Sequence, residues 1–150
     1  MRAMLLTRRG LLRAIDQQRV QQAIREAERQ TSGELRVSVS RFFWGDVRKV
    51  ADRAFGRLGM TATAQRNGIL FFIVPSRRRF VVLGDKGIHA KVGQDFWNDL
   101  TAAISAEFKK GRFQEGLLNG IAEAGARLGA AFPYNPATDK NELPDDIDIT

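Results

Sequence analysis

The sequence predicts a single α/β domain in which a small mixed β-sheet is flanked by helices. Residues 69–74 and 80–83 form two unbroken β-branched and aromatic runs, a pattern typical of strands that are buried on both faces. The short connection between them, a Pro-Ser pair followed by three arginines, predicts an antiparallel hairpin. Helical apolar patterns lie on both sides of this hairpin in the sequence, which predicts a sandwich of sheet and helices.

Two helices and one further strand are predicted before the hairpin. The first helix begins after Asp16, a typical N-cap residue, and Gly33 is expected to end it. The second helix begins after Asp46 and ends at Gly59. An alternating strand at residues 35–39 lies between them. Because strand, helix and strand in this order form a βαβ unit, we expect this strand and the first hairpin strand to be parallel.

Two helices are predicted in the second half of the chain. The first carries an apolar face over residues 96–108 and is closed by Gly111, and the second spans residues 113–132. Four glycines flank the apolar stripe of the second helix: Gly116, Gly120, Gly125 and Gly129. Because a glycine inside a helix costs about 1 kcal/mol relative to alanine, four of them predict close backbone packing.

We divide the chain into a basic N-terminal arm (residues 1–15), an α/β domain (residues 16–134) and an acidic C-terminal tail (residues 135–150). The net charge of +7 is unevenly distributed, because residues 139–150 carry −4 and the remaining residues carry +11. A body with this charge attracts anionic partners. We expect the tail to lie against the body and to screen part of its charge.

Composition excludes several classes of function. The chain has no cysteine, which excludes disulfides, thiolate metal sites and a cysteine nucleophile. Its only histidine, His89, excludes sites with several histidine ligands. Arginines interrupt the apolar residues near the N-terminus, so we predict no signal peptide and no transmembrane helix, and hence a cytoplasmic protein that can be peripheral to the membrane.

Three residues with oxygen-bearing side chains are predicted to meet at one edge of the sheet. Glu34 and Asn67 precede the two parallel strands, and Asp85 follows the antiparallel one. Carboxylate and amide oxygens are the ligands that Ca²⁺ and Mg²⁺ prefer, so this edge is a candidate metal site. Each residue alone also has a structural interpretation, Glu34 as a solvated strand end and the other two as turn residues.

The opposite edge of the sheet is predicted to be basic and aromatic. Arg77, Arg78 and Arg79 lie at the hairpin tip, and Trp44 follows the end of the first strand. Arginines combined with aromatic side chains can hold an anionic ligand or partner. The alternative is that the arginines only form a solvated loop.

The order of motifs resembles the TPM-domain family, named after thylakoid, photosystem-repair and related bacterial proteins. The resemblance rests on five segments in this order: Thr-Ser-Gly-Glu-Leu-Arg-Val at residues 31–37, Ala-Phe-x-x-Leu-Gly-Met at 54–60, Arg-Asn-Gly-Ile-Leu at 66–70, Gly-Asp-x-Gly-Ile at 84–88 and Asn-Glu-Leu-Pro-Asp at 141–145. The segment Asn-Glu-Leu-Pro-Asp at residues 141–145 resembles the short bacterial branch of the family. The resemblance implies an α/β sandwich, and it implies the acid phosphatase activity described for plant relatives or the calcium binding described for bacterial ones. Glu34, Asn67 and Asp85 fall in matching motifs, whereas Arg66 stands where many longer relatives have an acidic residue.

Two hypotheses of function follow. The first is a divalent-cation-binding module with at most weak phosphatase activity, in which Asp85 is the candidate ligand or base. The second is a non-enzymatic adaptor that docks an anionic or membrane-associated partner through the basic aromatic edge. A protein or a membrane surface is favoured over nucleic acid as that partner.

Overall fold

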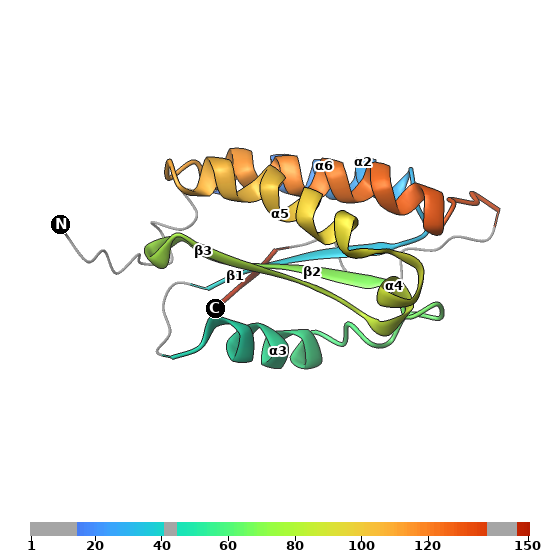
Figure 1. Cartoon of the computed structure of the whole chain (residues 1–150), viewed down its shortest axis with the longest axis horizontal. Helices are drawn as coiled ribbons and strands as arrows, with labels where there is room; N and C mark the ends of the chain where they lie inside the picture. The colour runs from blue at the N-terminus through green and yellow to red at the C-terminus, as the bar shows by residue number, and fades with distance from the viewer. Residues whose placement is uncertain (1–14, 41–44, 138–146) are drawn as a thin grey trace.

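Helices cover both faces of a four-stranded sheet in the computed structural model, which describes residues 15–40, 45–137 and 147–150 (Figure 1). The strands are β1 (Glu34–Val39), β2 (Gly68–Val74), β3 (Arg79–Gly84) and β4 (Asp148–Ile149). The helices are α2 (Gln17–Glu28), α3 (Val47–Arg57), α4 (Lys86–Lys91), α5 (Gln94–Phe108) and α6 (Phe113–Ala131), with a 3-10 turn at Pro75–Arg77. Helices α2, α5 and α6 lie on one face and α3 on the other. The predicted fold class is confirmed.

The sheet has the order β3-β2-β1-β4. Strands β1 and β2 are parallel, with Glu34 opposite Gly68. Strands β2 and β3 form the predicted antiparallel hairpin, with Val74 opposite Arg79. The beginnings of β1 and β2 and the end of β3 therefore lie at one end of the sheet, and the hairpin tip lies at the other.

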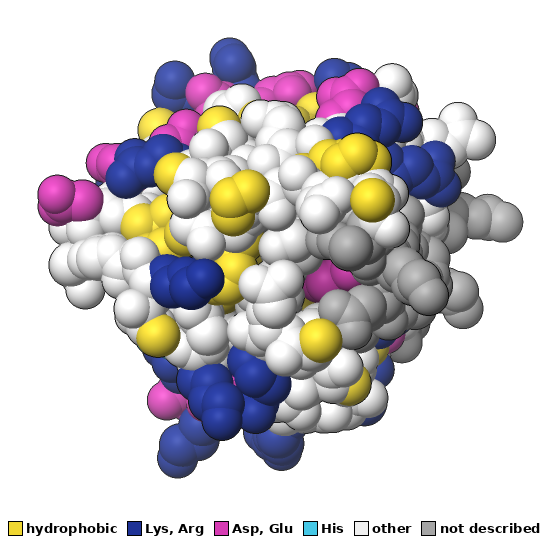
Figure 2. Space-filling view, turned by 90° about the vertical axis from the view of Figure 1, so that its right-hand side faces the viewer, with side chains coloured by type: hydrophobic (Ala, Val, Ile, Leu, Met, Phe, Trp, Pro, Cys, Tyr) yellow, Lys and Arg dark blue, Asp and Glu magenta, His cyan; other side chains and the backbone are white. Residues whose placement is uncertain are grey.

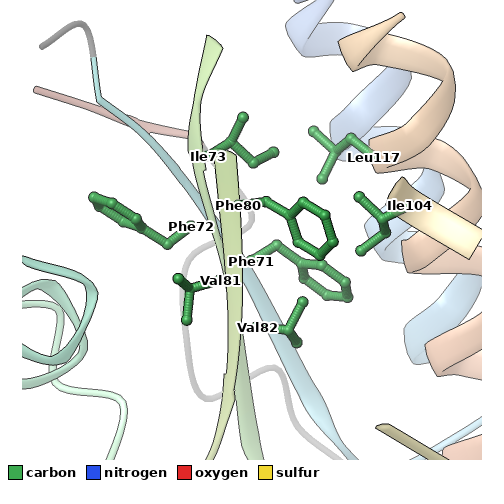
Figure 3. Close-up of a pocket in the computed structure, with 8 residues that line it drawn as sticks. All are labelled: Phe71, Phe72, Ile73, Phe80, Val81, Val82, Ile104 and Leu117. Atoms are coloured by element: carbon green, nitrogen blue, oxygen red, sulfur yellow. The ribbon is translucent and has the colours of Figure 1, made fainter. Parts of the chain in front are cut away.

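Strand β2 is the centre of the core, and all seven of its residues are buried. Its alternate side chains point to opposite faces, where Phe71 packs toward α5 and α6 and Phe72 packs toward α3. Figure 3 shows this division, with Phe71 on the same side of the hairpin as Ile104 and Leu117 and with Phe72 on the other side. The space among these side chains does not admit a water molecule, so this region is packed core rather than a ligand pocket.

The glycines of α6 allow two other helices to approach closely. A β-carbon at Gly120 would lie 2.6 Å from Cγ1 of Ile104 in α5. On the other side of α6, a β-carbon at Gly125 would lie 2.7 Å from Cβ of Ala27 in α2. The predicted close packing of this helix is therefore confirmed, and it explains why α6 contains residues that lower its intrinsic helix propensity.

Two predicted boundaries were wrong. Helix α2 ends at Glu28, well before Gly33, because the residues in between bond to the end of α6. In this segment the Thr31 hydroxyl donates to the carbonyl of Phe132 (2.6 Å) and accepts from the amide of Gly33 (3.1 Å). The segment at Asp85, predicted as a turn, begins α4, because the Asp85 carboxylate accepts from the Lys86 amide and caps the helix.

The last four residues of the predicted tail belong to the sheet and the core. Strand β4 pairs in parallel with β1, and Ile147 is only 7% exposed. The Asp148 carboxylate accepts two hydrogen bonds from Arg57 (2.8 and 3.2 Å) and one from the Ser38 hydroxyl (2.8 Å). For these four residues, the expectation that the tail lies against basic residues of the body is confirmed. Residues 138–146 lie outside the described residues.

We expect Ile147→Ala to lower the free energy of unfolding by about 2–4 kcal/mol, because it removes a buried side chain from the main core. Urea denaturation measures this loss. Tyr134→Ala is the control, since Tyr134 is 40% exposed and its removal should cost much less. Equal effects of the two substitutions would show that the C-terminal residues are not part of the fold.

We also expect the stability contributed by Asp148 to depend on pH. The hydrogen bond from Arg57 lowers the pKa of Asp148, and this exceeds the opposite effect of burial. Because the folded pKa lies below the unfolded value of about 3.9, the stabilisation is complete above about pH 5 and is lost as the pH falls through the folded pKa. The unfolding free energies of the unaltered protein and Asp148→Asn should therefore differ at pH 7 and converge in acid. A difference that does not change with pH would contradict this account.

Candidate functional site

The structure brings Glu34, Asn67 and Asp85 to the same end of the sheet. The Glu34 amide donates to the Asn67 carbonyl (3.2 Å), and the Asp85 amide donates to the Gly68 carbonyl (2.9 Å). All three residues are buried, with exposed fractions of 3%, 1% and 5%. Helix α4 starts here, so we call this the α4 end. Figure 2 looks onto it and shows both basic and acidic side chains around the rim, and a small acidic area near the centre.

The Asp85 carboxylate is held by an arginine. Arg66 donates from Nε to Oδ2 (2.6 Å) and from Nη2 to Oδ1 (2.9 Å), and the Lys86 amide donates to Oδ1 (2.8 Å). Burial raises the pKa of Asp85, but the hydrogen bonds from Arg66 and Lys86 outweigh it and leave the pKa below its ordinary value. Asp85 is therefore ionised at neutral pH, and the guanidinium of Arg66 compensates its charge.

Asn67 ties the start of β2 to the connection between α2 and β1. Its side-chain Nδ2 donates to the Ser32 carbonyl (3.2 Å), and its backbone amide donates to the Thr63 hydroxyl (3.1 Å). The side-chain oxygen Oδ1 is buried and accepts no hydrogen bond from the residues that the structure describes. One acceptor at the α4 end is therefore available to a bound cation or donor.

Glu34 lies on the face of the sheet that is covered by α3. It pairs with Gly68, where an added β-carbon would lie 2.8 Å from the carbonyl oxygen of Met60 after α3. On the same face of β1, Arg36 donates to the Leu58 carbonyl (3.3 Å). The carbonyl at the C-terminus of α3 is thus bonded to an arginine. No group of three or more histidine, aspartate or glutamate side chains that could hold a metal ion occurs within the described ranges.

The opposite end of the sheet carries a cluster of exposed basic residues. Arg78 at the hairpin tip donates to the Lys109 carbonyl (3.4 Å), which joins the tip to the turn between α5 and α6. Arg77 donates to the carbonyl of Gly45 (3.2 Å), so the segment before α3 also lies here. We call the following six exposed residues the basic end: Arg77, Arg78, Arg79, Lys109, Lys110 and Arg112. Trp44, predicted for the same edge, lies outside the described residues.

Sequence reasoning found three of these six cations and missed the three that follow α5. The run Lys-Lys-Gly-Arg at residues 109–112 was visible in the sequence, but only the fold places it beside the hairpin. Lysines at a helix C-terminus also favour the helix macrodipole, which gives Lys109 and Lys110 a structural role as well. Arg112 lies 3.6 Å from Glu107 and forms an ion pair with it.

Elsewhere, the described helices include none that is long and apolar enough to cross a membrane.

Comparison with known proteins identifies the family. A model of the TPM domain matches residues 6–127. The chain is similar to the BA42 protein of the psychrophilic bacterium Bizionia argentinensis, whose NMR structure superposes with a TM-score of 0.85 at 37% identity over 98% of this chain and 97% of that one. The fold is also similar to the N-terminal domain of the cg2496 protein of Corynebacterium glutamicum, with a TM-score of 0.58 at 12% identity over 87% of this chain and 75% of that one. None of the curated proteins compared with the chain matches it. The chain belongs to the TPM-domain family.

Proposed function

We propose that this TPM domain is a non-enzymatic binding module that docks an anionic partner through its basic end. The observation that carries the proposal is the hydrogen bond from Arg78 to the Lys109 carbonyl, which unites two turns about thirty residues apart into one cationic surface. All six cations of this surface are exposed. An anionic partner can therefore reach them without any rearrangement of the fold.

Electrostatics support this interpretation. Exposed like charges within a Debye length, about 8–10 Å at physiological salt, repel one another, and an anionic partner relieves that repulsion. Arginine guanidinium groups can also make paired hydrogen bonds to phosphate, sulfate or carboxylate groups. Glu107 lies 3.6 Å from Arg112 and compensates the charge of that one cation.

Divalent-cation binding at the α4 end is the second candidate function. It is favoured by the buried, available Oδ1 of Asn67 beside two buried carboxylates, those of Glu34 and Asp85. Oxygen ligands of this kind suit Ca²⁺ or Mg²⁺. Arg66 opposes it, because its guanidinium already holds both oxygens of Asp85 and would have to leave.

A weak phosphatase activity would depend on this second candidate. A cation bound there would supply charge that polarises a phosphoryl oxygen, and Asp85 would act as ligand or base. The low pKa of Asp85 suits a ligand better than a proton acceptor, because a strongly ionised carboxylate is a weak base. The Arg66 pair must open before Asp85 can take either role. Binding at the basic end requires no such step.

We expect the combined substitution Arg77→Ala, Arg78→Ala and Arg79→Ala to weaken binding to heparin and to reduce the slope of log Kd against log salt by about two to three units, since up to three ionic contacts are lost. Elution from a heparin column and titration at several salt concentrations measure both effects. Arg29→Ala with Lys91→Ala, at exposed positions near the α4 end, is the control. Unchanged heparin binding in the triple variant would exclude the basic end as the docking surface.

For the second candidate, we expect calcium at millimolar concentration to raise the Tm, because a cation that binds only the native state stabilises it. Asp85→Asn should abolish this rise, whereas Asp52→Asn, which alters an exposed carboxylate on α3, should keep it. Arg66→Gln should enlarge the rise, because it removes the competing cation. If the unaltered protein shows no calcium-dependent rise, the cation site does not exist.

A further inference from the structure

We infer that the anionic partner of the basic end is an acidic polypeptide segment, which adds to the outer edge of β3 as a further strand of the sheet. This inference rests on the proposed function and names the class of partner. Two observations lead to it: the backbone groups along the outer edge of β3, and the continuity of that edge with the basic end.

The hydrogen bonds of the sheet show which backbone groups of β3 point away from β2. The Asp85 amide donates to the Gly68 carbonyl (2.9 Å), and the two strands pair in antiparallel register from there. Because bonding to a neighbour alternates along an antiparallel strand, the backbone groups of residues 79, 81 and 83 bond to β2. The residues whose N–H and C=O groups point outward, where no described residue bonds to them, are Phe80, Val82 and Gly84.

The two edges of the sheet differ. At the other edge, β4 covers the end of β1, and the Thr150 amide donates to the Val39 carbonyl (3.0 Å). At the start of β1, the Glu28 carboxylate accepts from the Leu35 amide (3.1 Å). Strand β3 lacks the usual protection of an edge strand, since residues 80–84 include no proline and no charge and the pairing with β2 has no bulge. Such an edge is a template for another strand.

The side chains of β3 also indicate that its outer side is open in the described structure. Phe80, Val81 and Val82 are all half-buried, although Val81 points to one face of the sheet and the other two point to the opposite face (Figure 3). The described helices on both faces therefore leave this side of the strand partly exposed. An added strand would cover these three apolar side chains, which favours its binding in addition to the hydrogen bonds.

The outer edge of β3 leads directly into the basic end. Strand β3 begins at Arg79, the last arginine of the hairpin tip. Arg78 holds the turn after α5 beside this point through its bond to the Lys109 carbonyl. A strand that is antiparallel to β3 would run from the α4 end toward the basic end, and the residues that follow it would pass the six cations. Acidic residues at that position complement the charge of the basic end.

An acidic polypeptide fits both features. A polypeptide strand presents donors and acceptors in alternation at the spacing of a ladder, whereas the phosphate groups of lipids and nucleic acids offer acceptors alone. A second copy of this chain could also supply a strand, but its net charge of +7 would bring cations to cations. The charge at the end of the β3 edge therefore favours a different, acidic chain.

Titration with a synthetic peptide tests this inference on the full chain. The probe is Thr-Val-Thr-Val-Thr-Glu-Glu-Glu with an N-terminal fluorophore, in which five residues can pair with residues 80–84 and the glutamates can reach the basic end. We expect saturable binding by fluorescence anisotropy. Glutamine in place of the three glutamates should weaken binding about tenfold or more, because three ion pairs are lost.

A second peptide separates strand addition from charge. Pro-Pro-Pro-Pro-Pro-Glu-Glu-Glu keeps the three glutamates but has no N–H donors for a ladder, so it should bind about tenfold or more weakly than the probe. Equal binding of the two peptides would overturn the inference, because charge alone would then explain the binding.

Amide hydrogen exchange locates the added strand. At a peptide concentration of ten times the Kd, the outward amides of Phe80, Val82 and Gly84 should exchange about tenfold more slowly. The amides of Val81 and Leu83, which already bond to β2, should change less. If the three outward amides are already protected in the chain without peptide, another segment of the chain or a second copy occupies the edge, and the inference is overturned.

A substitution at Val82 tests the edge independently of charge. Val82→Pro removes one outward donor without removing a bond to β2, and should weaken peptide binding about tenfold or more while leaving heparin binding unchanged. Val82→Thr keeps the N–H group and the branched shape, and should retain peptide binding. Unchanged peptide binding in a folded Val82→Pro variant would contradict the inference. If this variant does not fold, the exchange measurement decides.

The failure of this inference differs from the failure of the proposed function. Heparin binding without peptide binding would overturn strand addition and leave the basic end as a docking surface. Binding to neither would overturn both. Binding to phosphatidylserine vesicles or to an RNA oligonucleotide, without binding to the peptide, would identify a different class of partner and overturn the inference.

Discussion

Burial of β2 on both faces is the constraint on which the rest of the structure depends. A strand with seven buried residues needs a neighbour along each edge and a helical layer over each face. Strand β1 supplies one edge in parallel and β3 the other in antiparallel orientation. This combination divides the loops of the molecule into two groups. The starts of β1 and β2 and the end of β3 meet at the α4 end, and the hairpin tip meets the turn after α5 at the basic end.

Two arginine–aspartate pairs fix other parts of the chain to the sheet. At the α4 end, the pair of Arg66 with Asp85 fixes the loop before β2 to the start of α4 and occupies the carboxylate. On the α3 face, the pair of Arg57 with Asp148 fixes β4 against β1. Loss of either partner would leave a partly buried charge uncompensated, which is costly. The six cations of the basic end are exposed and lie on neighbouring turns, and for this reason we assign binding to that end.

Local signals predicted most of the fold. The apolar run of β2 and the caps at Asp16 and Asp46 depend only on nearby residues, and all were found as expected. Strand β4 was missed because two residues carry no periodicity, and its pairing depends on contacts with Arg57 and Ser38 that are distant in sequence. For the candidate site, topology correctly predicted that Glu34, Asn67 and Asp85 meet at one end. It could not predict that Arg66 would hold Asp85, because that contact depends on side-chain geometry.

The central claim is that anionic ligands bind the basic end and not the α4 end. The most direct measurement is a titration of the ¹⁵N-labelled protein with a short heparin oligosaccharide, followed through backbone amide shifts. The account predicts saturable shifts at residues 77–79 and 109–112 and small changes at residues 66–68 and 85–87. Shifts confined to the loops around Arg66 and Lys86, with none at the hairpin tip, would contradict it.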